Sequence, residues 1–562
     1  MRNLFLIINI ISFILIQNSA SFSQWSDDPY VNTRVSDWGV NVIACQDGRG
    51  GASISFQNFN YDTTNLYFQQ IDSLGSLKWN SAIVISEIGN SNYPVDIFLG
   101  DSNSTLVCYS AGEVYFDSSF NQIILTEPYV QKLDNDGKKL WGEAGIKLRT
   151  DTTKFTNGST DFCIDENGGI FCFWDFSIPG GGSYTHKLYI QHISKNGERL
   201  WGENGILVAD SVLDSFGIKI ISDDSGGIFL QYPYEGKHFI EHYDSTGILK
   251  WTLKENLEYE KWIKDGEGGL ILSAVRQISV KKLILNRISH SGEKLWGEDG
   301  IVLDDSVTNI NPNPADLLLN SDNTVTASWD NGWYPVDDLF VQRFDLSGYK
   351  LWSDNLKVSN EISSKGDHGL LESEVNSNIL LYYLGRIPSG LYAQRIDKFG
   401  YKVWGDTDIA VTNLTPGLSQ IVSDGNYGAI VVFENDAPWG GILAQQISKN
   451  GNLGEIITSI KNNNYVPAIP KSHILSQNYP NPFNPSTTIS FAIPEKSFVT
   501  LKVYDVLGRE VANLVNEELE TGIFEMTFDA STLSSGVYIY RITAMKYGKI
   551  LFNESKQMLL IK

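Results

Sequence analysis

The sequence predicts an all-β protein, an eight-bladed β-propeller followed by a small Ig-like β-sandwich. One phrase, a strand that ends in a tight glycine turn and is followed by a tryptophan, recurs along most of the 562 residues. The composition is rich in turn and strand residues, with 50 Gly, 14 Trp, 26 Tyr and 27 Phe, and contains few helical patterns. The last ninety residues carry short alternating apolar segments between turns, which is typical of a small sandwich.

The first residues predict export. A short basic start, Met1 to Asn3, precedes an apolar run over residues 4–16 and then small residues. This is the pattern of a secretory signal peptide, so we expect a leader over residues 1–23, cleaved after Ala20 or Ser23. No later stretch approaches eighteen apolar residues, so we predict no transmembrane segment in the mature chain and export through the periplasm.

The repeated phrase is clearest at residues 191–205, where two strand patterns flank the turn Asn196-Gly197. Asn-Gly is a strong hairpin signal because both turn positions tolerate positive φ. Eight copies align on a turn glycine: Gly75, Gly137, Gly197, Gly247, Gly292, Gly348, Gly400 and Gly451. Seven copies place a tryptophan four residues later: Trp79, Trp141, Trp201, Trp251, Trp296, Trp352 and Trp404. The copies lie 45 to 62 residues apart, a period that predicts propeller blades.

An upstream hairpin with a Gly-rich or Asp-rich turn precedes each copy, which gives eight modules of four strands over residues 24–458. The eighth copy lacks its tryptophan, whereas Trp25 has no turn phrase before it. Because a closed ring leaves no free sheet edge, we predict that the N-terminal segment supplies the outer strand of the last blade. The eight tryptophans, Trp25 included, would then pack between neighbouring blades.

Five copies carry the full pattern Asp-x-x-Gly-x-x-x-Trp, beginning at Asp72, Asp134, Asp244, Asp345 and Asp397. This pattern resembles the tryptophan-docking repeat of quinoprotein-type propellers, which are commonly eight-bladed. It is also similar to the Asp-box of sialidase propellers, but one residue longer. Both resemblances concern structural turns, so they imply a fold and no activity.

The C-terminal region is a separate unit. A polar, proline-punctuated linker over residues 459–473 precedes an extended motif, Asn478-Tyr479-Pro480-Asn481-Pro482-Phe483-Asn484-Pro485. Strands are expected over residues 499–505, 510–515, 523–528, 537–543 and 549–552, with turns at Gly508 and Gly536, and the chain ends at Lys562. Residues 474–562 resemble the type A C-terminal sorting domain of the type IX (Por) secretion system. The resemblance implies the type IX translocon as partner, then release or attachment to surface glycolipid.

Charge and cysteine content limit the partners. The formal charge of −23 lies almost entirely outside the last ninety residues, and such a surface repels phosphate, so we expect no nucleic-acid partner. Four cysteines are too few for a disulfide framework. Cys163 and Cys172 flank one predicted turn and are either bonded or buried as small apolar residues.

Motifs for chemistry are scarce, and we predict no catalytic, cofactor or metal-binding residues. His238 and His242 have a ligand-like spacing, but on a strand they would lie too far apart to share a zinc ion. Four aromatic side chains in expected loops are candidate contacts for a glycan or protein ligand in the axial channel, or else pack at strand ends: Trp174, Trp329, Trp333 and Trp439. The predicted function is an exported binding or scaffold protein, and the alternative is a propeller enzyme, polysaccharide-degrading or quinone-dependent.

Overall fold

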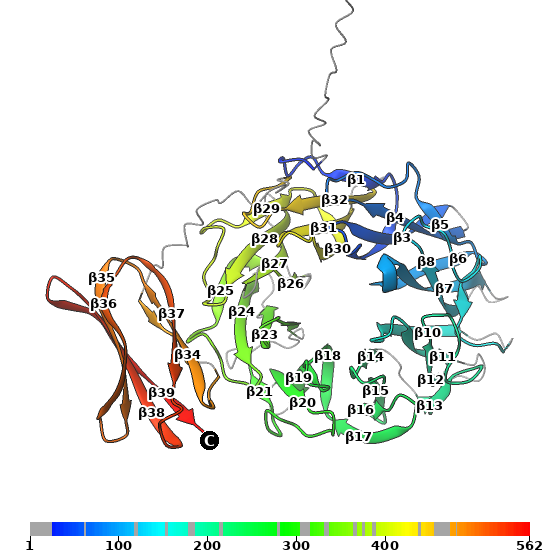
Figure 1. The fold of residues 1–562 in the computed structure, drawn as a ribbon. Coiled ribbons are helices and arrows are strands. Elements are labelled where there is room, and N and C mark those ends of the chain that lie inside the picture. The colour runs from blue at the N-terminus through cyan, green and yellow to red at the C-terminus, as the bar shows by residue number, and fades with distance from the viewer. Residues whose placement is uncertain are drawn as a thin grey trace, which may run out of the picture.

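The computed structural model describes the chain from residue 25 to its end, with internal gaps (Figure 1). The described ranges are 25–60, 63–116, 122–151, 156–177, 186–212, 217–277, 281–303, 315–330, 337–362, 368–373, 377–384, 389–436, 440–454, 473–478 and 480–562. Within them the chain forms strands β1 to β39 and one short 3-10 helix, Asp101–Asn103. The expected signal peptide lies outside the described residues, so the sequence remains its only basis.

Most strands belong to four-stranded antiparallel sheets, numbered here in chain order. Sheet 1 contains β2 (Val40–Gln46), β3 (Ala52–Asn60), β4 (Thr63–Ile71) and β5 (Ile83–Ser86). Sheet 2 contains β6 (Ser91–Leu99), β7 (Thr105–Phe116), β8 (Gln122–Leu133) and β9 (Ile146–Lys147). Sheet 3 contains β10 (Thr156–Ile164), β11 (Ile170–Ser177), β12 (His186–Ile193) and β13 (Ile206–Val212). Sheet 4 contains β14 (Lys219–Ser222), β15 (Ile228–Tyr234), β16 (Lys237–Tyr243) and β17 (Leu249–Glu255).

The next four sheets repeat this order. Sheet 5 contains β18 (Leu257–Lys264), β19 (Leu270–Gln277), β20 (Lys281–Ile288) and β21 (Ile301–Val302). Sheet 6 contains β22 (Asp316–Leu319), β23 (Thr324–Asp330), β24 (Asp337–Asp345) and β25 (Leu356–Ile362). Sheet 7 contains β26 (His368–Glu372), β27 (Ser377–Leu384), β28 (Gly390–Asp397) and β29 (Ile409–Thr412). Sheet 8 contains β30 (Pro416–Ser423), β31 (Ala429–Asn435), β32 (Ile442–Ile447) and β1 (Thr33–Ser36).

The sheets stand around a common centre, and the first strands β10, β14, β18, β26 and β30 face the middle (Figure 1). First strands of successive sheets contact one another from β2 to β30, and β30 contacts β2. The middle strands are buried on both faces, as in β23, where all seven residues are buried. A strand that is buried on both faces has a continuous run of apolar residues in its sequence, and not an alternation of apolar and polar residues.

The repeated phrase acts where neighbouring sheets meet. Trp201, after the turn at Gly197, is 7% exposed and packs against Phe171, with ring centroids 5.4 Å apart. Its indole Nε1 donates a hydrogen bond to the carbonyl oxygen of Ser245, in the turn of the next sheet, at 3.3 Å. Its backbone N–H is accepted by the buried side-chain oxygen of Gln191 at 3.1 Å. At this junction the phrase therefore places one large ring and two hydrogen bonds.

The other tryptophans of the phrase occupy matching places. The rings of Trp25, Trp79, Trp141, Trp251, Trp296, Trp352 and Trp404 lie against the turn glycine of the following sheet, at Gly75, Gly137, Gly197, Gly292, Gly348, Gly400 and Gly451. Of these rings, Trp25, Trp296 and Trp352 are buried and the others are partly buried.

The N-terminal segment completes the last sheet, as the sequence predicts. β1 pairs antiparallel with β32, with Thr33 opposite Ala444 and Ser36 opposite Ile442. Trp25 precedes this strand and lies beside Gly454, after the eighth turn. The start and the end of the repeat region thus share one sheet.

The cysteines are free thiols. Cys163 and Cys172 lie on adjacent strands but in different apolar clusters, so their side chains point to opposite faces of sheet 3. Of the two sequence-based alternatives, burial as small apolar residues is therefore correct.

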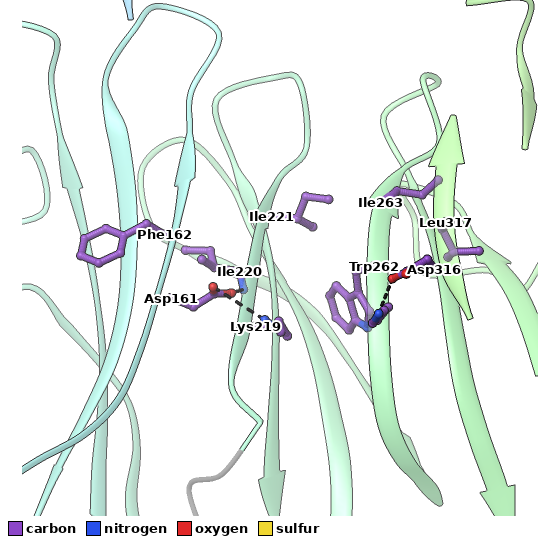
Figure 2. A pocket seen from close by; sticks show the side chains of 10 residues that line it. Asp161, Phe162, Lys219, Ile220, Ile221, Trp262, Ile263, Asp316 and Leu317 are labelled. Atoms are coloured by element: carbon purple, nitrogen blue, oxygen red, sulfur yellow. Dashed lines mark hydrogen bonds and ion pairs between the residues drawn. The ribbon is translucent and has the colours of Figure 1, made fainter. Parts of the chain in front are cut away.

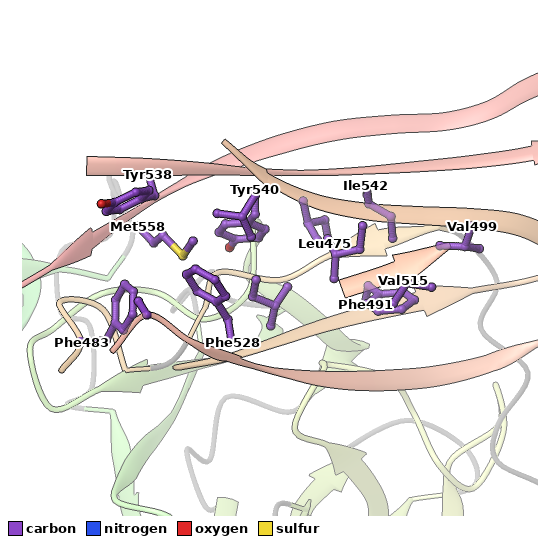
Figure 3. Packing of buried hydrophobic residues seen from close by; sticks show 14 of the residues in the cluster. Leu475, Phe483, Phe491, Val499, Val515, Phe528, Tyr538, Tyr540, Ile542 and Met558 are labelled. Atoms are coloured by element: carbon purple, nitrogen blue, oxygen red, sulfur yellow. The ribbon is translucent and has the colours of Figure 1, made fainter. Parts of the chain in front are cut away.

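The C-terminal region forms two sheets that enclose one apolar core (Figure 3). The smaller sheet contains β33 (Ile474–Leu475), β34 (Ser486–Ile493) and β37 (Gly522–Asp529). The larger contains β36 (Glu510–Leu519), β35 (Ser497–Asp505), β38 (Gly536–Lys546) and β39 (Lys549–Leu560). Val499, Leu501 and Val503 alternate with more exposed residues along β35, the pattern of a strand with one face in the core.

Candidate functional site

The first strands of sheets 3 to 6 line a cavity of about 380 Å³ (Figure 2). One charged residue from each strand borders it: Asp161, Lys219, Lys261 and Asp316. Each of the four is the fourth pair from the hairpin turn in its sheet, so the same register brings all four to one level. Trp262 adds an aromatic ring to the lining.

The charges around this cavity form two acid–base pairs, with the two lysines next to each other. The backbone N–H of Ile220 donates to Asp161 at 2.8 Å, and Lys219 Nζ lies 3.8 Å from the same carboxylate. Lys261 forms an ion pair with Asp316, and His368 Nδ1 from β26 lies 2.5 Å from the other oxygen of Asp316. The cavity therefore presents both signs of charge within a short arc of the ring.

The pKa values of the carboxyl groups shift in opposite directions at the two ends of the arc of charged residues. Burial and the neighbouring Asp161 carboxylate raise the pKa of Asp96, on β6, to about 7. Burial likewise raises the pKa of Asp161. Burial acts in the same direction on Asp316, but the facing His368 and Lys261 outweigh it and lower the pKa of Asp316. One end of the arc thus holds Asp161, whose pKa is raised, beside Asp96, which can take up a proton near neutral pH, and the other end holds Asp316, whose pKa is lowered.

The four tryptophans expected as ligand contacts do not form a site in the described residues. Trp174 is 1% exposed and Trp329 is fully buried, which fits the alternative that these rings pack within the sheets. Trp174 stacks on Tyr189 and Trp329 on Phe340, both from the adjacent strand, because these tryptophans face the neighbouring sheet rather than the solvent. Trp333 and Trp439 lie outside the described residues.

Three other side chains come close enough to share a metal ion. Ligand atoms of Asp223, His242 and His290 lie within 4.8 Å of one another, the only such group found in the described ranges. His238, the sequence neighbour of His242, instead lies 2.6 Å from Gln231 Nε2. The spacing of residues in the sequence could not reveal this group, because its members come from two different sheets. The alignment of the eight repeat copies locates the hairpins but does not show which side chains meet between sheets.

Within the C-terminal motif, Asn478 and Phe483 are buried in the sandwich. The side chain of Asn478 donates to Pro480 O at 3.1 Å and Thr487 Oγ1 at 2.9 Å. Phe483 is 2% exposed, and its backbone bonds to Leu559 and Ile561 attach the motif to the final strand. The Oδ1 of Asn481 accepts a hydrogen bond from the N–H of Leu559 at 2.8 Å. The motif therefore has a structural role, because these hydrogen bonds hold it against the final strand, β39.

The remaining motif residues lie nearer the surface. Pro485 O accepts the N–H of Ala530 at 2.9 Å, and the Lys562 ammonium donates to Ser531 O at 2.6 Å. Gly508 occupies a turn with φ of +77°, where Asp505 accepts two backbone N–H groups. Pro480, Pro482 and Asn484 lie in the bend before β34, Gly536 starts β38, and Tyr479 lies outside the described residues.

A repeat region of four-stranded antiparallel sheets joined to a small sandwich defines a propeller-like protein with an accessory domain. Residues 477–551 match the family described as the secretion system C-terminal sorting domain, Por_Secre_tail. This confirms the type IX sorting domain and indicates secretion, with handling by the type IX system and cell-surface or outer-membrane attachment. No helix in the described residues is long and apolar enough to span a membrane.

No curated protein matches the chain. Among solved structures, prolyl oligopeptidase B from Galerina marginata is similar, with 11% identity over 72% of this chain and a TM-score of 0.39. The match spans 57% of that enzyme's length. A protein of unknown function from Dyadobacter fermentans has 10% identity over 74% of this chain and 94% of its own, with a TM-score of 0.33. A PL25 ulvan lyase has 11% identity over 76% and 96%, with a TM-score of 0.37.

Proposed function

We propose that the mature protein is an exported eight-bladed β-propeller, residues 24–458, carried by a sorting domain over residues 474–562. Residues 1–23 are the signal peptide and 459–473 the linker. Eight successive four-stranded sheets support the blade number, and the contact of β30 with β2 supports closure. The pairing of β1 with β32 supports a joint made by the two ends of the repeat region.

The propeller is a binding module whose site is the arc of charged residues at its axis. One observation supports this proposal above all: four charged residues lie at the same level around one cavity, namely Asp161, Lys219, Lys261 and Asp316. Lys219 and Lys261 keep nearly half of their side-chain surface exposed, 46% and 43%, whereas the paired carboxylates are largely covered. The accessible groups are therefore cationic, and they fit an acidic oligosaccharide or an acidic peptide segment better than a neutral ligand.

An array of acidic and neutral oligosaccharides and peptides tests this function. We expect the purified protein to bind acidic probes, and Lys219→Met and Lys261→Met each to weaken that binding by about tenfold or more, as expected for a charge-assisted contact. Lys187→Met is the matched control, because Lys187 pairs with Asp210 on the third and fourth strands of sheet 3, away from the cavity lining. Absence of acidic-probe binding, or binding as tight as the wild type by both cavity variants, would contradict the proposal.

A second candidate function is polysaccharide cleavage, favoured by one specific observation. Asp96 and Asp161 are neighbouring carboxyl groups with raised pKa values, as a general acid requires. Chromatography of the array's acidic polysaccharides after incubation distinguishes the two functions. Product release abolished by Asp96→Asn and Asp161→Asn, but retained in Lys187→Met, identifies an enzyme. Unchanged polysaccharide bound by the wild type identifies a binding module.

A further inference from the structure

The junction between sheets 4 and 5 contains a group of side chains that shares no residue with the axial cavity. Asp223 lies in the turn between β14 and β15, and His242 lies on β16 of the same sheet. His290 lies in the turn that follows β20 in the next sheet. The Nε2 of His242 is 2.8 Å from Asp223 Oδ2, and the Nδ1 of His290 is 3.9 Å from the same oxygen. We propose that these three side chains bind a divalent transition-metal ion of the zinc class.

The carboxylate is already held in place for this role. Oδ1 of Asp223 accepts the backbone N–H groups of Ser225 and Gly227, at 2.8 and 2.7 Å, which leaves Oδ2 directed at the two imidazoles. The position of this carboxylate therefore costs little to fix on binding.

The packing of His242 fixes the position of its imidazole ring but does not fix which ring nitrogen carries the proton. The ring of His242 is buried and stacks on Phe229, with centroids 4.7 Å apart. Its Nδ1 has no hydrogen-bond partner among the described residues. An imidazole that binds a cation through Nε2 carries its proton on Nδ1, and in His242 no other hydrogen bond from the described residues occupies that nitrogen.

The second imidazole forms the open side of the site. The side chain of His290 is 51% exposed, and its ring centroid lies 4.4 Å from that of His242. The His290 turn is positioned by the tryptophan repeat, because its backbone carbonyl accepts the indole N–H of Trp251 at 2.9 Å. Its Nδ1 also lies 3.2 Å from Gly268 O, a contact that the metal would replace. Solvent can reach this side of the group, so an ion has a route of entry and a place for a water ligand.

Two imidazole nitrogens and one carboxylate oxygen form a donor set that suits zinc and its neighbours in the first transition row. Calcium and magnesium prefer oxygen donors alone. An ion held here would connect sheet 4 to sheet 5, because Asp223 and His242 belong to one sheet and His290 to the other.

Sheet 3 of the same chain contains a similar aspartate–histidine pair, with which the site can be compared. Asp165 and His192 repeat the pair, with 2.7 Å between Oδ2 and Nε2, and Asp165 also accepts two turn amides. The position that corresponds to His290 is Ser245, whose carbonyl accepts the indole N–H of Trp201. Other sheets place arginine, lysine or glutamine where His242 stands, as Arg287 does beside Asp265 at 2.8 Å. The Asp–polar pair is therefore a structural feature of the repeat, and His290 is what makes this junction different.

Calorimetric titration of the chelator-treated full protein with zinc chloride tests the site. We expect one zinc ion per chain for the wild type. His290→Ser copies the arrangement of sheet 3 at an exposed position, so it should leave the fold intact, as circular dichroism will verify. It should weaken zinc binding by at least about tenfold, the lower end of what loss of even an outer partner costs a metal site.

Two further variants sharpen the result. His238→Ala removes the histidine four residues before His242, and we expect it to bind zinc as the wild type does. Ser245→His combined with His290→Ser moves the third ligand to the turn of sheet 4 that faces the Asp165–His192 pair of sheet 3, and we expect it to recover binding of one ion. The proposal is overturned if the wild type binds no zinc, or if His290→Ser binds zinc as tightly as the wild type.

Discussion

The indole Nε1 of Trp25 donates a hydrogen bond to the backbone carbonyl of Ser73 at 3.1 Å, across 48 positions of sequence. Trp404 makes the same bond to Lys449 at 2.9 Å, Trp352 to Lys398 at 2.8 Å and Trp296 to Leu346 at 3.0 Å. The contact of Trp25 is therefore one more copy of the repeated junction. Its indole comes from the N-terminal segment that also supplies the last strand of sheet 8.

Removal of this ring should open the joint between the two ends of the repeat region. Trp25 is 5% exposed and packs in a cluster with Val42, Ile54 and Ile71. We expect Trp25→Ala to lower the free energy of unfolding by about 3–5 kcal/mol, the usual cost of truncating a buried aromatic residue. Urea denaturation measures the loss. Trp38→Ala, at a residue 62% exposed, is the control and should change stability by less than about 0.5 kcal/mol. Equal losses in the two variants would contradict this role.

The turn glycines are required for two separable reasons. Gly247 has φ of +79°, and a Cβ there would lie 2.3 Å from Ile206 Cδ1 and 3.3 Å from the ring of Trp201. Gly202 has φ of +84° with nothing within 4 Å of such a Cβ. Gly202→Ala should therefore cost about 1–2 kcal/mol for the left-handed backbone alone. Gly247→Ala should cost about 1–3 kcal/mol more, because the added methyl overlaps its neighbours. Thermal unfolding of the pair tests this difference, and equal midpoints would show that the contact has no energetic role.

Local features of the fold could be predicted from the sequence because each hairpin is specified by its own turn. Asp397 illustrates this, since its Oδ1 accepts the N–H groups of Phe399 and Tyr401 within one turn. The position of Trp25 could also be predicted, because it lies one repeat length before Trp79 in an otherwise regular series. In the tail, strand β35 extends only two residues beyond the expected 499–505, at its start.

Burial across sheets could not be predicted in the same way. The sequence predicts Trp329 in a loop, but it lies within β23, whose seven residues are all buried. The arc of charged residues could not be predicted from the sequence either, because Lys219 and Lys261 reach the same level only when β14 and β18 lie side by side in the fold. His242 and His290 meet for the same reason, at a junction between sheets. Contacts of this kind depend on how the copies pack and not on the copies themselves.

The carboxyl group of Asp96 predicts a specific pH dependence of stability. Its pKa in the folded protein, about 7, lies above the ordinary value of 3.8, so between these values the folded state binds more protons than the unfolded state. Stability contributed by this group is therefore present at pH 5 and lost as the pH rises through 7. We expect the wild type to lose about 1–3 kcal/mol from this source between pH 5 and pH 8.

Asp96→Asn should remove most of that loss, because the amide stays neutral throughout. Urea titrations at pH 5 and pH 8 measure it. Asp244→Asn is the control, since Asp244 is an exposed turn carboxylate whose pKa is lowered by hydrogen bonds from Thr246 and Ile248. That variant should instead lose stability at pH 8. An Asp96→Asn variant with the same pH dependence as the wild type would contradict the assignment.

The sorting domain allows a test of whether its motif acts through its fold. Phe483 is 2% exposed in the core beside Phe528, whereas Phe498 in the same domain is 41% exposed (Figure 3). We expect Phe483→Ala to destabilise the domain by about 3–5 kcal/mol and to detach the motif from β39. In a host with a type IX translocon, the variant should accumulate in the periplasm, while Phe498→Ala should be secreted at the wild-type level. Immunoblots of periplasmic and culture fractions measure both. Normal secretion of Phe483→Ala would mean that the translocon recognises another part of the domain, and that the contact with Leu559 serves stability alone.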